Sequence, residues 1–442
     1  MSGLVPGLPP AGRAAVRGGI VGNYVDQINI FLPVVALAPA LTTLAGPHAG
    51  ATAGALVIAA TLVGRPVGSM IFGRISDRVG RTSTTKIAIA GTACASLAIA
   101  AIPSHELIGP LAIALVIALR FIGGIFLAGE YTSAIPLAME WSRPKRRGLV
   151  SGLIMSMAPW AQSTIAIATA ILLALLGPQA YAEWGWRAAF VAGGLASSAL
   201  LVYYSRKVAD APAVSTRRGP TEGSLGLRAV LSGPYAGAFW QSFALMTGLW
   251  FMTNMVVIVA ARRLADDVAF TSGQVAIAMG VASIAQALVM SVTGHLSTLV
   301  GRRRFLVGWG LLAATVAPVT WSFVMGQRAL LPVAAGMALL QVVTVTAYGP
   351  MGAYLSERFP AHVRATGYGT AYSLSIVGPA LYFLYLPAIE DLLGHDGAVM
   401  AVLVVGGLLV AAAAAFGPAL RPRELDADVE SVAERQRVGA RT

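Results

Sequence analysis

The sequence predicts an all-α membrane protein with twelve transmembrane helices arranged in two six-helix halves. Three observations predict this fold class. Hydrophobic residues make up 57% of the 442 residues and charged residues only 11%, whereas a soluble domain carries roughly a quarter charged residues. Apolar segments long enough to cross a bilayer recur along the whole chain. Finally, a polar pattern in the first half of the chain is repeated in the second.

The apolar segments and the polar stretches between them define the expected domain organisation. We expect an N-terminal half at 1–205, a cytoplasmic linker at 206–232, a C-terminal half at 233–420 and a cytoplasmic tail at 421–442. The first residues are expected to form a short cytoplasmic lead-in, because no cleavage site of a signal peptide follows the first apolar run. The predicted spans are 17–40, 50–73, 83–103, 107–139, 148–176, 186–205, 233–262, 271–297, 303–325, 328–356, 364–389 and 396–418.

The basic residues predict the orientation of these spans. Most of the 31 Lys and Arg residues fall in the loops on one side, which the positive-inside rule assigns to the cytoplasm. We therefore expect a multi-pass protein of the plasma (inner) membrane with both termini in the cytoplasm. The net charge of +12 then reflects topology, and no nucleic-acid partner is needed to explain it. The basic residues left outside or within the membrane are Arg187, Arg262, Arg263, Arg328, Arg65 and Arg120.

The most specific local pattern lies at the end of the second apolar segment. There the helix runs out into a tight turn that carries Gly73, Asp77, Gly80 and Arg81. Glycines allow so short a connection, and Asp77 can accept hydrogen bonds from the N-terminus of a neighbouring helix.

The turn recurs in the second half of the chain, with Thr298 in the place of Asp77. We therefore expect a parallel duplication in which the second turn has lost its carboxylate function. The gating residues predicted from both copies and their surroundings are Arg65, Gly73, Asp77, Gly80, Arg81, Glu140, Arg147, Glu357 and Arg364.

The turn pattern G-x-x-S-D-x-x-G-R resembles the helix 2–3 loop signature of the major facilitator superfamily. The preceding Arg65-Pro66-x-Gly68 resembles the metabolite:proton symporter family within that superfamily, as does Gly129-Glu130-Tyr131 in the fourth segment. The resemblance implies the major facilitator fold, with a substrate bound near the membrane midplane between the two halves.

Charged side chains within the bilayer are energetically costly, so each of them is a candidate for a functional role. They are Asp26, Arg65, Arg120 and Glu130. Counted from the cytoplasmic start of the first span, Asp26 lies about 14 Å into the membrane, at 1.5 Å per residue. Counted from the outer start of the fourth span, Arg120 lies about 20 Å in, so both are close to the midplane. We therefore expect Asp26 to pair with Arg120, and Glu130 with Arg65.

Two interpretations of these pairs remain open. In one, they are static ion pairs that lock the helices together. In the other, Asp26, Arg120 and Glu130 couple transport to protons, because protonation of Asp26 would free Arg120 to bind a substrate anion. The predicted substrate-binding residues are Tyr24, Asn23, Arg120, Tyr131, Gln162, Trp250, Asn254, Tyr348 and Tyr372.

The chain carries no signature of catalysis. No His, Cys or Asp cluster has metal-ligand spacing, and no phosphate-binding fingerprint is present, so neither a metal nor a cofactor is expected and ATP is not the energy source. We expect a monomer whose partners are a small-molecule substrate, protons and the lipid bilayer.

The resemblance and the buried charges together predict proton-coupled symport of a small organic carboxylate or zwitterion by alternating access. An efflux antiporter for an organic compound is the alternative. A receptor built on a transporter scaffold would need a sizeable soluble domain, which the sequence lacks.

Overall fold

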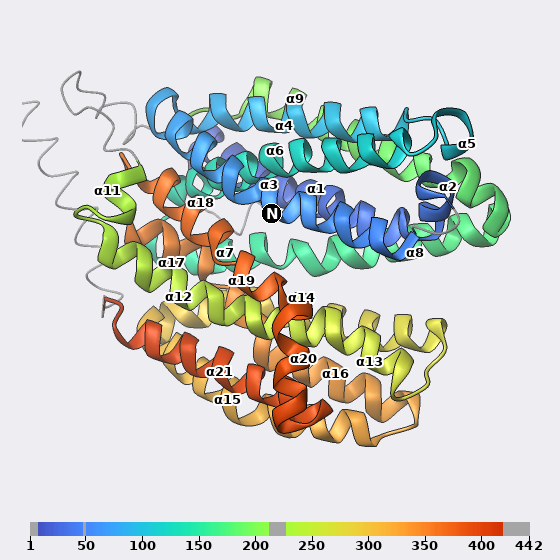
Figure 1. The fold of residues 1–442 in the computed structure, drawn as a ribbon. Coiled ribbons are helices and arrows are strands. Elements are labelled where there is room, and N and C mark those ends of the chain that lie inside the picture. The colour runs from blue at the N-terminus through green and yellow to red at the C-terminus, as the bar shows by residue number, and fades with distance from the viewer. Residues whose placement is uncertain (1–7, 47–49, 212–226, 419–442) are drawn as a thin grey trace, which may run out of the picture.

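The computed structural model describes residues 8–46, 50–211 and 227–418, and in these ranges every regular element is a helix. The helices run side by side in two lobes, one formed by the blue to green part of the chain and the other by the yellow to red part (Figure 1). The predicted all-α class is confirmed. Most of the predicted linker 206–232 and the whole tail 421–442 lie outside the described residues.

The N-terminal lobe begins with α1, which starts seven residues before the predicted span. The spans here are long because they extend beyond the hydrocarbon core at one or both ends. The elements of this lobe are α1 (Pro10–Phe31), η1 (Leu32–Ala36), η2 (Ala38–Ala40), α2 (Leu41–Ala45), α3 (Gly50–Val79), α4 (Arg81–Ala100), α5 (His105–Ile108), α6 (Leu111–Trp141), α7 (Pro144–Met155), α8 (Met157–Ala180), η3 (Tyr181–Gly185) and α9 (Trp186–Lys207).

The C-terminal lobe follows the same plan, with more interruptions in its helices. Its elements are α11 (Leu227–Leu231), α12 (Ala236–Thr253), η4 (Asn254–Val259), α13 (Ala260–Asp266), α14 (Ser272–Val300), α15 (Arg302–Gly326), α16 (Leu330–Val345), η5 (Thr346–Tyr348), α17 (Met351–Arg358), α18 (Arg364–Leu374), α19 (Val377–Ala380), α20 (Tyr382–Leu393) and α21 (His395–Ala415).

The number of spans agrees with the prediction of twelve. Among the described residues, 9 helical runs are long and apolar enough to cross a membrane, and two bent pairs raise the number to 11. One of the runs, Pro144–Lys207, has 64 residues and would measure about 96 Å if straight. It is broken at Gly177, where φ is 79°. It therefore contains both the fifth and the sixth span, which brings the number of spans from 11 to twelve.

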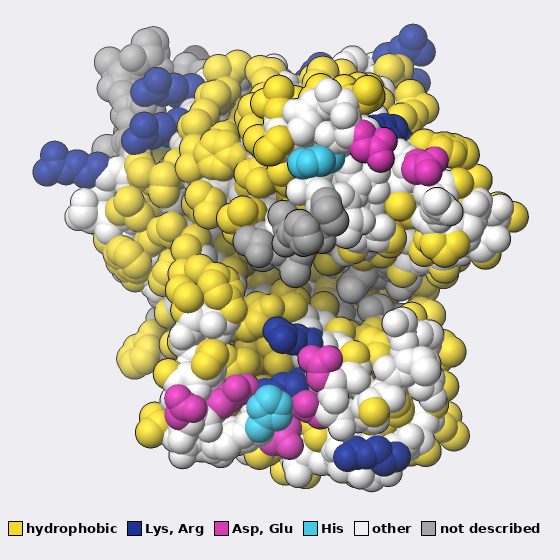
Figure 2. Space-filling view, turned by 45° about the vertical axis from the view of Figure 1, so that its right-hand side comes forward, with side chains coloured by type: hydrophobic (Ala, Val, Ile, Leu, Met, Phe, Trp, Pro, Cys, Tyr) yellow, Lys and Arg dark blue, Asp and Glu magenta, His cyan; other side chains and the backbone are white. Residues whose placement is uncertain are grey.

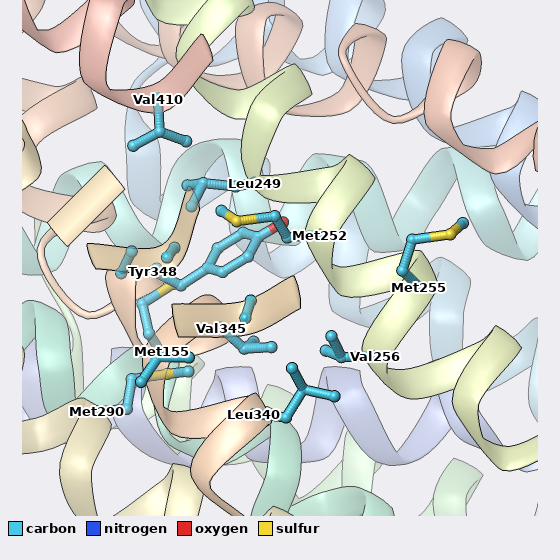
Figure 3. Close-up of a cluster of buried hydrophobic side chains, with 14 of the residues drawn as sticks. Met155, Leu249, Met252, Met255, Val256, Met290, Leu340, Val345, Tyr348 and Val410 are labelled. Carbon is cyan, nitrogen blue, oxygen red and sulfur yellow. The ribbon is translucent and has the colours of Figure 1, made fainter. Parts of the chain in front are cut away.

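The surface and the interior of the lobes are both apolar. Leu175, Val319 and Leu331 are more than two-thirds exposed, and hydrophobic side chains cover most of the surface seen in Figure 2, as expected for a protein that faces lipid. In the C-terminal lobe, methionines and branched side chains pack around Tyr348 (Figure 3), with Met155 of the other lobe beside Met290. One apolar cluster therefore extends from the C-terminal lobe into the other lobe, and further clusters lie within each lobe.

The two lobes are held together at the end where α9 ends and α11 begins, which we call the linker end. Asp77, at the end of α3, accepts hydrogen bonds from the backbone amides of Ala365 (3.0 Å) and Thr366 (2.9 Å) and from the Thr366 hydroxyl (2.7 Å). These are donors in the first turn of α18, where a carboxylate is favoured by the helix dipole. The expected partner of Asp77, a neighbouring helix N-terminus, is thus α18 of the other lobe.

An ion-pair network extends this contact. Arg81 pairs with Asp77 (2.6 Å) and with Glu140 (3.2 Å), and it donates a hydrogen bond to the carbonyl oxygen of Ala361 in the other lobe (2.8 Å). Arg364 also donates to Glu140 (2.8 Å). All of these carboxylates and Arg81 are buried. The network therefore closes the linker end of the interface between the lobes.

The second copy of the turn makes a weaker contact. Thr298 lies against Gly148 at the start of α7, where an added Cβ would come within 2.1 Å of the Thr298 hydroxyl, yet that hydroxyl has no hydrogen-bond partner among the described residues. Arg302 binds Glu357 within the C-terminal lobe. The expected loss of carboxylate function in the second turn agrees with this geometry.

Most predicted gating residues lie in these two networks. Arg147 is 3.9 Å from Glu357, Gly73 packs against the backbone of Thr366, and Gly80 turns the chain with a φ of 113°. Arg65 is the exception, because it lies away from the linker end, at the cavity described below. Assigning Arg65 to the gate was therefore wrong in this structure.

The asymmetry of the two turns predicts different effects of two substitutions. Asp77→Asn should loosen the linker end, because it removes a charge that accepts three hydrogen bonds and pairs with Arg81. The reporter is Ser356→Cys, at a buried position on α17 next to Glu357, in a background where the exposed Cys94 is replaced by Ser. We expect about a tenfold higher labelling rate, since a charged hydrogen bond contributes roughly 1.5–3 kcal/mol.

Thr298→Val is the matched control, because its hydroxyl is unpartnered and its labelling rate should stay within about twofold of the parent. Equal labelling in both variants would contradict the asymmetric gate.

Candidate functional site

A cavity of about 220 Å³ lies between the two lobes. Both lobes contribute to its lining, which is predominantly apolar and aromatic with a few polar side chains, as is typical of small-molecule sites. The lining residues from the N-terminal lobe include Asn23, Gln27, Thr61, Arg65, Tyr131 and Gln162, and those from the C-terminal lobe include Trp250, Thr253, Asn254, Gln286, Tyr348 and Tyr372.

Interruptions of the helices surround this cavity. Asn254 opens the π-helical turn η4, and Tyr348 ends the 3-10 turn η5. Met155 precedes the break between α7 and α8, and Ile376 lies between α18 and α19. Irregular backbone at membrane depth is tolerated where it is buried in protein or lines a cavity, and broken helices commonly form transporter sites. The interruptions of the helices and the cavity therefore indicate the same candidate binding site.

Arg65 is the charged group of this cavity. Of the lining residues that the structure describes, Arg65 alone carries a charge, and its side chain is only 5% exposed. Its guanidinium carbon lies 6.0 Å from the ring centre of Tyr131 and 5.8 Å from that of Tyr372. Its Nε has no hydrogen-bond partner among the described residues. A buried guanidinium with a free donor at a cavity wall is a ready site for an anion.

A pair of buried carboxyl groups lies behind Arg65. The side chains of Asp26 on α1 and Glu130 on α6 are hydrogen-bonded to each other, and Arg65 interacts electrostatically with Asp26. Ionised carboxylates only accept hydrogen bonds, so a bond between two of them needs a proton on one. Neither group is among the described residues that line the cavity. The pair can therefore hold a proton out of contact with the substrate space.

Arg120 does not take part in this arrangement, and its predicted pairing with Asp26 was wrong. Its guanidinium donates to the Thr61 hydroxyl (3.1 Å) and to the backbone oxygen of Asn29 (3.0 Å). The predicted pairing of Glu130 with Arg65 was also wrong, because Glu130 binds Asp26. Arg120 thus joins α6 to α1 and α3.

Depth along the helices does not by itself decide these pairs. Counted from the linker end of each helix at 1.5 Å per residue, Asp26 lies about 24 Å along α1 and Arg65 about 21 Å along α3. Arg120 lies about 31 Å along α6, more than a turn further than either. Glu130 lies about 17 Å along α6 from its linker end, so Asp26 is about as far in depth from Glu130 as from Arg120, and the rotation of each helix about its axis decides which side chains meet. The early start of α1 at Pro10 moves Asp26 deeper than expected.

Seven of the nine predicted substrate-binding residues line the cavity, and two do not. Arg120 is one of these two, and Tyr24 is the other, since its hydroxyl pairs with Thr164 (2.7 Å) on an exposed face. The seven are Asn23, Tyr131, Gln162, Trp250, Asn254, Tyr348 and Tyr372.

The sequence reasoning missed Gln27, Thr253 and Gln286, and it assigned Arg65 to another role. Gln27 follows Asp26 directly, and Thr253 precedes Asn254, so a search for polar residues next to the chosen ones would have found both. Among the described residues, no group of three His, Cys, Asp or Glu side chains is arranged to hold a metal ion.

Three comparisons with known proteins agree with this geometry. The chain is 24% identical over 411 residues to a proline/betaine transporter of Escherichia coli (strain K12), covering 89% of this chain and 82% of that protein. It is 27% identical over 328 residues to the alpha-ketoglutarate permease of the same strain, covering 72% and 73%. A solved structure of the proton:xylose symporter XylE matches with a TM-score of 0.78 at 16% identity, covering 94% of this chain and 98% of that one.

The family model of the Major Facilitator Superfamily matches residues 25–371, which is most of the chain. This match includes the turn at Asp77, the buried carboxyl pair and almost all of the cavity. The two curated relatives are membrane transporters, and the matching structure has the same arrangement of helices in two lobes. The chain is therefore a multi-pass membrane transporter that belongs to the Major Facilitator Superfamily.

Proposed function

We propose that this transporter couples the uptake of a small organic carboxylate or zwitterion to the movement of a proton in the same direction. The observation that supports the proposal is the position of Arg65, between a cavity and a pair of hydrogen-bonded carboxyl groups that can share a proton. The side chain of Arg65 then links the site that would bind the anion to the site that would bind the proton.

Charge balance supports one carboxylate for each proton. With Asp26 and Glu130 both ionised, they balance Arg65 and Arg120. When the pair takes up one proton, the buried groups carry one net positive charge. An uncompensated buried cation is costly, so the protonated state recruits one anion. The carboxylate can bind Arg65 through two parallel hydrogen bonds, which suit the planar guanidinium.

The conformation supports the alternating-access part of the proposal. The linker end is closed by Asp77, Arg81 and Glu140. If both termini are cytoplasmic, as the basic loops favour, the structure is closed to the cytoplasm, and uptake requires the two halves at 1–205 and 233–420 to rock about the cavity. The two curated relatives are named for proline, betaine and alpha-ketoglutarate, all of which carry a carboxylate.

The proton-sharing pair predicts the effect of Glu130→Gln on purified protein in liposomes. A pH difference of two units can drive about a hundredfold accumulation when one proton moves with each substrate molecule, since each unit corresponds to about 1.4 kcal/mol. In Glu130→Gln this accumulation should fall to about the external concentration, because an amide cannot take up or release the proton. Exchange of labelled for unlabelled substrate should continue.

Labelled proline, trimethylglycine and 2-oxoglutarate serve as the test substrates, and the exposed Glu106→Gln serves as the control. Full accumulation in Glu130→Gln would show that the pair does not couple transport. Loss of a preloaded substrate on imposing the same gradient on the wild type would support the antiporter instead.

The corrected position of the anion site predicts different effects of two conservative substitutions. Arg65→Lys should weaken carboxylate binding by about tenfold or more, because Lys keeps the charge and loses the bidentate geometry. Arg120→Lys should leave the affinity within about twofold, yet lower the melting temperature, because Arg120 binds Asn29 and Thr61.

Both variants are measured by calorimetric titration of the purified protein, with the melting temperature recorded in parallel. If Arg120→Lys loses affinity while Arg65→Lys keeps it, Arg65 is not the anion site.

A further inference from the structure

Three aromatic rings form one side of the cavity. Trp250 of α12, Tyr348 of η5 and Tyr372 of α18 come from three different spans, and we call them the aromatic corner. The ring centre of Trp250 lies 5.4 Å from that of Tyr348, at an interplanar angle of 67°, and 5.6 Å from that of Tyr372, at 79°. Rings at such steep angles present faces in more than one direction, so together they can contact different sides of a compact ligand group.

The polar ends of these side chains are already engaged within the protein. The Trp250 indole N–H donates to the backbone oxygen of Tyr372 (3.4 Å), and the Tyr348 hydroxyl accepts from Thr253 (3.5 Å). The Tyr372 hydroxyl is hydrogen-bonded by Arg65. The aromatic corner can therefore offer a ligand mainly ring surface, because its hydrogen-bonding groups already have partners within the protein.

The rings already attract one cation. Arg65 packs against Tyr372 and Tyr131, with its guanidinium carbon 5.8 and 6.0 Å from the ring centres, within the range of a cation–π interaction. Trp250, whose ring attracts cations most strongly, contacts no basic side chain in a described cation–π pair. The ring of Trp250 therefore remains for a cation that the ligand brings, with the cavity-facing part of Tyr348 beside it.

The charges of the cavity restrict the ligand further. No carboxylate is among the described lining residues, so a primary ammonium group would find no ionic acceptor for its N–H donors. An alkylated ammonium has few or no such donors and binds ring faces well. A second carboxylate on the ligand would find no second cation among the same residues, which disfavours dicarboxylates.

We propose that the preferred substrate is an N-alkylated zwitterion with one carboxylate. Its carboxylate binds Arg65, and its alkylated ammonium lies in the aromatic corner, against Trp250 and Tyr348. The proposal rests on the proposed function for the carboxylate site, and it adds the cation site and the substrate class.

A pair of ligands of equal shape tests the cation site. Trimethylglycine and 3,3-dimethylbutanoate have the same carboxylate and the same three methyl groups, but only the first has a positive charge. Calorimetric titration of the purified wild type should give an affinity for trimethylglycine about tenfold higher or more, since a desolvated cation–π contact contributes roughly 2 kcal/mol. Equal affinities, or no binding of trimethylglycine, would overturn the proposal.

Three variants complete the experiment. Trp250→Leu should reduce the preference for trimethylglycine to about twofold or less, and Trp250→Phe should restore part of it, which a general folding defect would not do. Unchanged preference in Trp250→Leu would also overturn the cation site. Arg65→Lys should weaken both ligands alike, since they share the carboxylate.

The outcome also separates this inference from the proposed function. If 3,3-dimethylbutanoate or 2-oxoglutarate is accumulated under a pH gradient as well as trimethylglycine, proton-coupled carboxylate transport stands while the cation site fails. If none of these carboxylates is accumulated by the wild type, the proposed function itself is contradicted.

Discussion

The hydrogen bond between the buried carboxyl groups of Asp26 and Glu130 is the constraint on which the rest of the structure depends. Two carboxylates at membrane depth are costly when both are ionised, and a shared proton relieves that cost. Arg65 is placed where it interacts with Asp26 on one side and lines the cavity on the other. In the proposed mechanism, a change in the proton content of the pair alters how strongly Arg65 attracts a ligand, although the pair itself does not line the cavity.

The helix α18 connects this site to the closed end of the molecule. Its first turn is bound by Asp77 through Ala365 and Thr366, and Tyr372, about 9 Å further along the helix, contacts Arg65 and Trp250. Because a short helix moves nearly as a rigid body, release of its first turn at the linker end also displaces Tyr372. One element thus contacts both the closed end and the cavity. The second turn packs against α7 at Thr298, whose hydroxyl has no hydrogen-bond partner among the described residues.

The sequence predicted the spans well because crossing a bilayer demands long apolar segments, and because the duplicated turns gave the register of the two halves. It also placed Trp250, Asn254 and Tyr372 at the cavity, since polar and aromatic groups in apolar helices need a buried site. It failed for the charge pairs. The rotation of each helix about its axis decides whether Asp26 meets Arg120 or Glu130, and a count of residues does not encode it. The position of Arg65 at the cavity could be found only with the helices assembled.

Infrared spectroscopy of the purified protein tests most directly, and without a known substrate, whether Asp26 and Glu130 share one proton. A hydrogen-bonded protonated carboxyl group gives a distinct C=O stretching band, which should appear and disappear as the pH is changed. We predict that Asp26→Asn and Glu130→Gln each remove or shift the same band, because both groups hold the same proton. A band that is unchanged in either variant would contradict the shared proton and with it the account of coupling.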